Sequence, residues 1–171
     1  MKTFIVLGMH RSATSLISEG LAKAGVDMGC KAGSNNLGFN PGGLWEDRRF
    51  LELHDSILKL AGGTWDNPPV EKLIVEAGEK HWKQLRNLAK QRTAEATAKK
   101  KLLWGWKEPR TTLTIRCWMP YIENPHFITC FRDPMEVAQS LFRRDKIPVK
   151  RGLDIAKIYN VRLLRFLGEK I

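Results

Sequence analysis

The feature that most constrains the fold of this chain is a strand-to-helix transition at its N-terminus. Residues 3–8 (TFIVLG) form a short β-branched run that ends at a glycine, which is typical of a buried strand. The apolar residues that follow recur on one helical face from Leu16 to Ala24, and Gly25 is a suitable C-terminal stop. A strand, a tight turn and a helix in this order predict the first unit of an α/β fold.

The rest of the chain continues the alternation. Short apolar runs predict buried strands at residues 102–106 and 126–131. Apolar periodicity predicts further helices from Asp47 to Gly62, from Pro69 to about residue 98, after a cap at Thr111 or Thr112, after Asp133, and over residues 152–168. The pattern predicts one domain with a mostly parallel sheet flanked by helices.

The helix after Asp133 has the clearest start in the sequence. Asp133 is the predicted N-cap, Pro134 suits the first helical position, and Glu136 completes a capping box. By contrast, residues 26–47 are rich in Gly, Asn and Pro, and an irregular segment of this length is typical of a functional loop.

Composition narrows the class of protein. The formal net charge of +11 favours anionic partners such as nucleotides, phosphorylated or sulfated polymers, nucleic acid or membrane surfaces. No apolar run approaches the roughly 18 residues of a membrane span, and the N-terminal apolar stretch is too short for a signal peptide. We therefore expect a cytoplasmic protein, with Cys30, Cys117 and Cys130 reduced and structural, and with no metal site.

The turn between the first strand and helix is a candidate phosphate cradle. Segment 8–15 (GMHRSATS) lies where a P-loop, G-x-x-x-x-G-K-[ST], would lie, and backbone N–H groups of such a loop bind phosphate oxygens. Gly8 and Ser15 match the pattern, whereas Ala13 replaces the second glycine and Thr14 replaces the lysine. The missing lysine disfavours an ordinary ATPase or kinase, and Arg11 supplies a cation inside the loop instead.

Basic residues follow the ends of all three predicted strands. Arg11, Lys107 and Arg132 are each just past a strand, and ligands of open parallel sheets bind outside the carboxyl ends of the strands. We therefore expect the three cations to converge on one crevice. Ser140 lies two helical turns beyond Asp133 on the same face, so that Arg132 and Ser140 are predicted to share one phosphate.

Taken together, these segments resemble a known family. FIVLGMHRSATSL looks like the 5′-phosphosulfate loop of the P-loop sulfotransferases, which use 3′-phosphoadenosine 5′-phosphosulfate, and FRDPMEVAQSLFRR looks like their 3′-phosphate motif. GFNPGGLWED and WGWKEPRTTLT are similar to segments of bacterial-type and tyrosylprotein-type members. The resemblance implies a sulfotransferase-like fold over residues 1–171, without the C-terminal strand and segment usual in the family.

The same resemblance implies roles for individual residues. Arg11 would lie near the transferring sulfonate, Lys107 would stabilise that group, and Glu46 would be the catalytic base, with Glu108 and His10 in reserve. His54, His81 and His126 are expected at the surface or in the core. The implied nucleotide-binding residues are His10, Arg11, Ser12, Ala13, Thr14, Ser15, Arg132 and Ser140, of which Ser12 to Ser15 would hold the 5′-phosphate and the last two the 3′-phosphate.

The implied activity is sulfonate transfer to a hydroxyl or amine of a small-molecule, carbohydrate or lipid acceptor, without a metal. Two alternatives stay open: a non-catalytic nucleotide- or polyanion-binding module, which Ala13 favours, and a P-loop kinase of small molecules. Specific nucleic-acid binding would rest on net charge alone and is not expected. Ala13 would cost on the order of 1 kcal/mol if its φ were positive.

Overall fold

A computed structural model describes residues 1–29 and 45–169 of the chain. In this part of the chain, three parallel strands form one sheet: β1 (Lys2–Gly8), β2 (Leu103–Lys107) and β3 (Pro125–Cys130), in the order β2-β1-β3. The central strand pairs Ile5 with Trp106 on one side and with Phe127 on the other. The predicted α/β class with a parallel sheet is confirmed, and all three strands end at the same edge.

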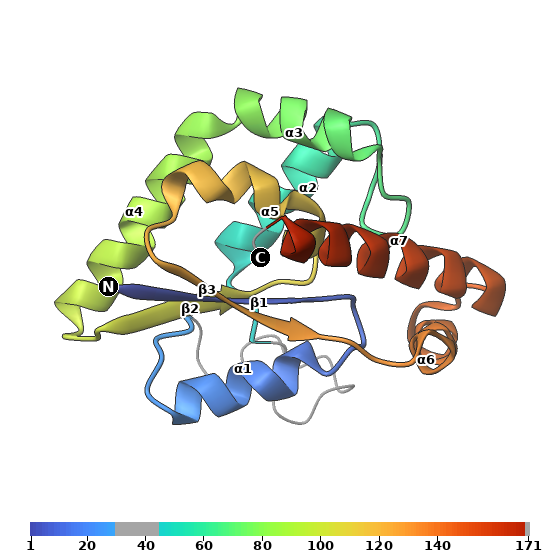
Figure 1. Cartoon of the computed structure of the whole chain (residues 1–171), viewed down its shortest axis with the longest axis horizontal. Helices are drawn as coiled ribbons and strands as arrows, with labels where there is room; N and C mark the ends of the chain where they lie inside the picture. Colours follow the sequence, from blue (N-terminus) through green and yellow to red (C-terminus); the bar gives the residue numbers. More distant parts are fainter. Residues whose placement is uncertain (30–44, 170–171) are drawn as a thin grey trace.

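Helices cover both faces of the sheet (Figure 1). Among the described residues, α1 (Thr14–Lys23) is the helix on one face, and α6 (Pro134–Asp145) lies beyond the carboxyl ends of the strands. The opposite face carries α2 (Arg48–Leu60), α3 (Glu71–Lys80), α4 (Trp82–Ala98), α5 (Thr111–Trp118) and α7 (Val149–Gly168), with the short 3-10 helix Met119–Tyr121 after α5.

The main hydrophobic core lies under the larger helical layer. Phe50 of α2 packs against Trp106 of β2 and Trp118 of α5, with ring centroids 4.7 and 5.0 Å apart. A smaller cluster on the α1 face joins Val6, Val26, Met28, Trp45 and Cys130. Trp45, directly before Glu46, is therefore an anchor for the end of the irregular segment, most of which (residues 30–44) lies outside the described residues.

Two predicted helix boundaries were wrong. The predicted helix from Pro69 to about residue 98 is two helices that meet at His81. Gly78, near the end of α3, is packed so closely on Cys117 that a Cβ there would lie 2.4 Å from Sγ. The last helix begins at Val149, directly after Pro148, rather than at residue 152.

The predicted threonine N-cap of α5 was also wrong. The N-cap of α5 is Arg110, and Thr111 and Thr112 are its first helical residues. Their hydroxyls are used elsewhere: Trp106 Nε1 donates to Thr111 Oγ1 at 3.0 Å, and Thr112 contacts Gly8.

Helix α1 buries a different face from the predicted one. Leu16 is 67% exposed, whereas Thr14 and Ser18 are buried. Ser18 Oγ donates to the Thr14 carbonyl at 2.9 Å, which lets a hydroxyl residue be buried with its polar group satisfied. The helix ends as predicted, with Gly25 at φ 96° and its N–H donating to Ala22 O.

The start of α6 agrees with the sequence in one half of the capping box. Asp133 Oδ1 accepts from the Glu136 N–H at 3.0 Å, as expected of an N-cap. The Glu136 side chain does not return to Asp133; it accepts from Arg132 Nε at 2.8 Å. Glu136 thus holds the arginine at the end of β3.

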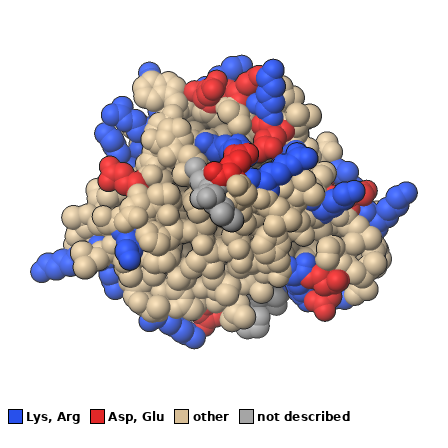
Figure 2. Space-filling model, viewed as in Figure 1, with Lys and Arg blue, Asp and Glu red and all other residues tan. Residues whose placement is uncertain are grey.

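Figure 2 shows lysine and arginine side chains spread over the viewed face, with acidic side chains among them rather than one continuous basic block. No helix in the described ranges is long and apolar enough to cross a membrane. Cys117 and Cys130 are free and buried.

Candidate phosphate-binding site

The loop after β1 has the shape expected of a tight phosphate-binding turn. A Cβ on Gly8 would lie 2.7 Å from the Cys130 carbonyl, so only glycine allows β1 and β3 to approach this closely. Arg11 and Ala13 adopt left-handed backbone conformations, with φ 69° and 62°. These two turns bring the chain from β1 into the N-terminus of α1, where the helix dipole favours anions.

Helix α5 holds the loop in place through hydrogen bonds between Thr112 and Gly8. The Gly8 N–H donates to Thr112 Oγ1 at 2.8 Å, and the Thr112 hydroxyl donates to the Gly8 carbonyl at 3.1 Å. Thr112 is buried, with 2% of its surface exposed. Sequence analysis gave Thr112 only a capping role; the hydroxyl run TTLT after a strand end was the available indication of a positioning residue.

The predicted convergence of basic residues is confirmed. A cavity of about 250 Å³ at the carboxyl ends of the strands is lined by Arg11, Lys107 and Arg132, and also by Arg144 of α6. Ala13, Thr14 and Ser15 line the same cavity, together with His10 and Glu46. Ser12 does not line it: this residue is 3% exposed, and its N–H donates to Met9 O at 3.2 Å inside the turn.

A second cavity of about 240 Å³ adjoins the first and is lined by Arg11, Ser140, Arg143 and Arg144. Arg11 stands between the two, since its Nε donates to Ser140 Oγ at 2.8 Å and its carbonyl accepts from Arg132 Nη1 at 3.0 Å. Arg132 and Ser140 therefore line different cavities. Arg11 lies between them, and that Arg132 and Ser140 share one phosphate stays a prediction.

The arginines of the two cavities repel one another. Burial lowers the pKa of Arg11, and the neighbouring charge of Arg144 lowers it further; the carboxylate of Asp145 raises it in part, and Arg132 and Arg143 lower it by smaller amounts. A bound anion would stabilise the charged guanidinium of Arg11, because the anion offsets both the lost solvation and the repulsion from the other arginines. The electrostatics thus favour an anionic ligand between α1 and α6.

Glu46 and Lys107 form a nearly buried ion pair in the first cavity. Lys107 Nζ lies 2.7 Å from Glu46 Oε1, and the two side chains are 1% and 10% exposed. An ammonium has three donors, so Lys107 can hold Glu46 and still donate to an oxygen of a ligand.

His10 contributes an imidazole with an unusual environment. Its ring packs against Trp65, with centroids 4.3 Å apart, and Nε2 is buried without a hydrogen-bond partner among the described residues. Burial lowers the pKa of His10 well below its ordinary value, so the ring is neutral at pH 7. A neutral imidazole at a cavity wall can accept a proton.

Glu108, named as a reserve base, is a structural residue. It is fully buried and does not line the cavity; His54 Nδ1 donates to it at 2.6 Å, and the Arg110 N–H donates at 3.1 Å. Burial alone would raise the pKa of Glu108, but the hydrogen bond from His54 and the charges around it lower the pKa to about 2. Trp118 Nε1 donates to His54 Nε2 at 2.9 Å, so His54 is a core residue, as expected.

A buried arginine holds the segment that carries Glu46. Arg92 of α4 is fully buried; its Nη1 donates to Glu95 at 2.6 Å and its Nη2 to the Asp27 carbonyl at 3.2 Å. Its Nε lies 3.8 Å from Asp47, the neighbour of Glu46. These residues are far apart in the sequence and carry no common motif, so sequence analysis did not find them.

Comparisons of the chain with protein-family models, with curated proteins and with solved structures gave no match. In the described ranges, no three His, Cys, Asp or Glu side chains are grouped as metal ligands. The function must therefore be inferred from the site itself.

Proposed function

We propose that the chain is a sulfotransferase of the P-loop type, which binds 3′-phosphoadenosine 5′-phosphosulfate and transfers its sulfonate to a hydroxyl or amine acceptor. The observation that carries the proposal is the meeting of Arg11, Lys107, Arg132 and Arg144 in one cavity beside the 8–15 loop. Such a set of donors suits a ligand with several negative charges.

The residues present fit this nucleotide. Ala13, Thr14 and Ser15 bring the N-terminus of α1 to the wall of the cavity, where the helix dipole would favour a 5′-phosphate. The adjoining cavity at Ser140, Arg143 and Arg144 offers donors for a second phosphate. Two neighbouring basic cavities that share Arg11 favour a nucleotide with phosphates at both ends of its ribose.

Sulfonate transfer needs a base and a stabilised leaving group. Glu46 takes the proton of the acceptor hydroxyl while the acceptor oxygen forms its bond to sulfur. The bond between sulfur and the bridging oxygen breaks, and its electron pair stays on the 5′-phosphate. Arg11 and Lys107 stabilise the charge on that phosphate and on the sulfonate oxygens.

His10 is the second candidate for the base, because its imidazole is neutral and lines the same cavity. Glu46→Gln and His10→Gln distinguish the two. If Glu46 is the base, Glu46→Gln lowers kcat by at least 100-fold, the usual contribution of general base catalysis, while nucleotide affinity is retained.

Calorimetry with adenosine 3′,5′-bisphosphate, ADP and Mg–ATP tests the binding. The 3′-phosphorylated nucleotide should bind most tightly without metal, and Arg132→Ala should weaken it. Arg86→Ala removes the same charge from the opposite edge of the sheet and is the matched control. Equal affinity for ADP would refute the proposal, and a requirement for Mg²⁺ with ATP would favour the kinase alternative.

Turnover is tested separately with labelled donor over carbohydrate, lipid, phenol and peptide acceptors. A labelled product supports the transferase and identifies the acceptor class. Tight binding of adenosine 3′,5′-bisphosphate with no product from any acceptor would favour the non-catalytic binding module. That alternative has one observation behind it, since Ala13 holds a left-handed conformation where the family has glycine.

A further inference from the structure

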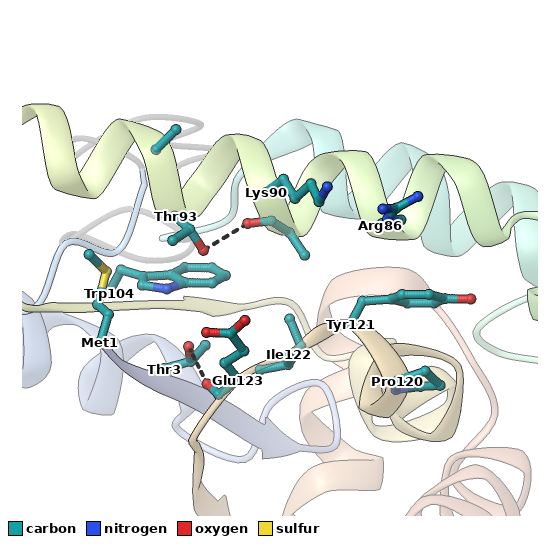
Figure 3. A pocket seen from close by; sticks show the side chains of 12 residues that line it. Met1, Thr3, Arg86, Lys90, Thr93, Trp104, Pro120, Tyr121, Ile122 and Glu123 are labelled. Atoms are coloured by element: carbon teal, nitrogen blue, oxygen red, sulfur yellow. Dashed lines mark hydrogen bonds between the residues drawn. The ribbon is translucent and has the colours of Figure 1, made fainter.

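A larger cavity lies at the opposite edge of the sheet. It has a volume of about 430 Å³ and is formed between α4 and the amino ends of β1 and β2, closed on the third side by the segment 120–123. Figure 3 shows its lining side chains. We call it the amino-edge cavity. Because the strands are parallel, it is separated from the basic cavities by the length of the sheet.

The floor of the amino-edge cavity is aromatic and apolar. The Trp104 ring, only 2% exposed, and Ile122, 8% exposed, are fixed in the core, and the Tyr121 ring lies at the side (Figure 3). Ligand sites for small molecules typically have volumes of about 300–1,000 Å³, mostly apolar walls and a few polar groups that fix orientation. The volume and the walls of this cavity have that character.

Charged groups stand on two sides of the cavity, along α4 and beneath the Trp104 ring (Figure 3). Arg86 and Lys90 lie one helical turn apart on α4, on the same helix face, and Glu123 lies on the other side (Figure 3). Within the described residues, none of these three side chains has a hydrogen bond or an ion pair with the protein. The Glu123 carbonyl accepts from Thr3 Oγ1 at 3.1 Å, which fixes the backbone that carries the carboxylate.

We propose that the amino-edge cavity binds a small aromatic zwitterion. The flat ring lies against Tyr121, above the floor that the buried Trp104 and Ile122 form, the carboxylate pairs with Arg86 and Lys90, and the ammonium pairs with Glu123. A ligand with a single charge fits only one side of the cavity, because Glu123 would repel an anion, and Arg86 and Lys90 would repel a cation. This inference does not depend on the proposed sulfotransferase activity.

Three matched probes test it by calorimetry with the full chain. L-Tryptophan carries both charges, indole-3-propionate lacks the ammonium, and tryptamine lacks the carboxylate. L-Tryptophan should bind at least tenfold more tightly than either analogue. Failure of all three probes to give saturable binding would overturn the proposal, as would equal affinities for the three.

Substitutions assign each charge. Glu123→Gln should remove the advantage of L-tryptophan over indole-3-propionate, and the pair Arg86→Met and Lys90→Met should remove its advantage over tryptamine. Ala94→Trp places a ring in the cavity from an exposed position of α4 and should abolish binding of every probe. Binding that survives Ala94→Trp unchanged would place the ligand elsewhere and refute the assignment.

Two controls separate this site from loss of folding and from the nucleotide site. Thermal unfolding of each variant shows whether the fold is retained. Arg11→Gln, at the other edge of the sheet, should leave L-tryptophan affinity unchanged. In NMR spectra, the Trp104 indole N–H should shift on titration with L-tryptophan; an unmoved Trp104 resonance would contradict the proposed floor of the site.

Discussion

Ala13 holds a backbone conformation that L-amino acids adopt at a cost. Its φ of 62° and ψ of 17° are left-handed, and a Cβ raises the energy of this region by about 1–2 kcal/mol relative to glycine. A glycine in place of Ala13 would also give the unfolded chain more conformational freedom, which lowers the free energy of unfolding by about 0.4–1 kcal/mol. We therefore expect Ala13→Gly to raise the free energy of unfolding by about 0.5–1 kcal/mol, as measured by urea denaturation.

The matched control for Ala13 is the same substitution in a helix. Ala94 is exposed in α4, where glycine costs about 1 kcal/mol, so Ala94→Gly should destabilise the protein. The two substitutions are expected to have opposite signs. A loss of stability in both would mean that Ala13 is not strained.

His10 makes stability depend on pH. Burial lowers the pKa of His10 in the folded state, while an unfolded histidine titrates near about 6.5. Below about pH 6.5 the unfolded state binds a proton that the folded state does not, so stability falls as the pH falls, by up to about 1.4 kcal/mol per pH unit. Urea denaturation between pH 7.5 and 5.5 should show a steeper loss in the parent than in His10→Gln.

His126, which lies outside the core, supplies the control for that experiment. His126→Gln should keep the pH dependence of the parent. If His10→Gln loses stability on acidification as steeply as the parent does, burial does not lower the pKa of His10.

At the level of elements, two helix N-caps of the same residue type should differ in strength. Asp133 caps α6 at an exposed position, so Asp133→Ala is expected to cost about 1 kcal/mol. Asp47 caps α2 and also lies 2.6 Å from Arg49 and 3.8 Å from the buried Arg92, so Asp47→Ala should cost about 2–4 kcal/mol. Equal losses in urea denaturation would show that the Arg92 contacts add nothing.

The elements themselves were largely readable from the sequence. The strands ending at Gly8, Lys107 and Cys130 and the helix start at Asp133 follow from local patterns of apolarity and capping. The division of α3 from α4 at His81 was not readable, because no proline marks it; His81 there contacts the distant Ser56 of α2 as well as the Ala77 carbonyl. Local patterns specify elements, whereas contacts between distant residues decide where some of them end.

The site shows the same division between local and distant information. That Arg11, Lys107 and Arg132 meet in one cavity follows from parallel strands with cations at their ends. The hydrogen bond from Gly8 to Thr112, the ion pair of Glu46 with Lys107, and the position of Arg11 between Arg132 and Ser140 depend on side-chain packing that no motif encodes.

For the whole molecule, the location of the positive charge matters more than its total. Arginines gather at the carboxyl edge of the sheet, where Arg11, Arg132, Arg143 and Arg144 line two adjoining cavities. Arg132 and Arg144 each also contact a carboxylate, Glu136 and Asp145, as Arg116 elsewhere contacts Glu71 and Glu169. A multivalent anion should therefore stabilise the fold at the carboxyl edge beyond what ionic strength achieves by screening alone.

Pyrophosphate measures this effect without assuming any nucleotide. At a concentration 100-fold above its Kd, a ligand of the folded state adds about 2.7 kcal/mol, which raises Tm by about 5–10 °C for a domain of this size. We expect pyrophosphate to raise Tm more than sodium chloride does at matched ionic strength. Arg11→Gln should remove that excess, while Arg86→Gln, with the same change of charge at the amino edge, should retain it. Equal shifts in the two variants would show that the anion acts on net charge alone and does not occupy the 8–15 loop.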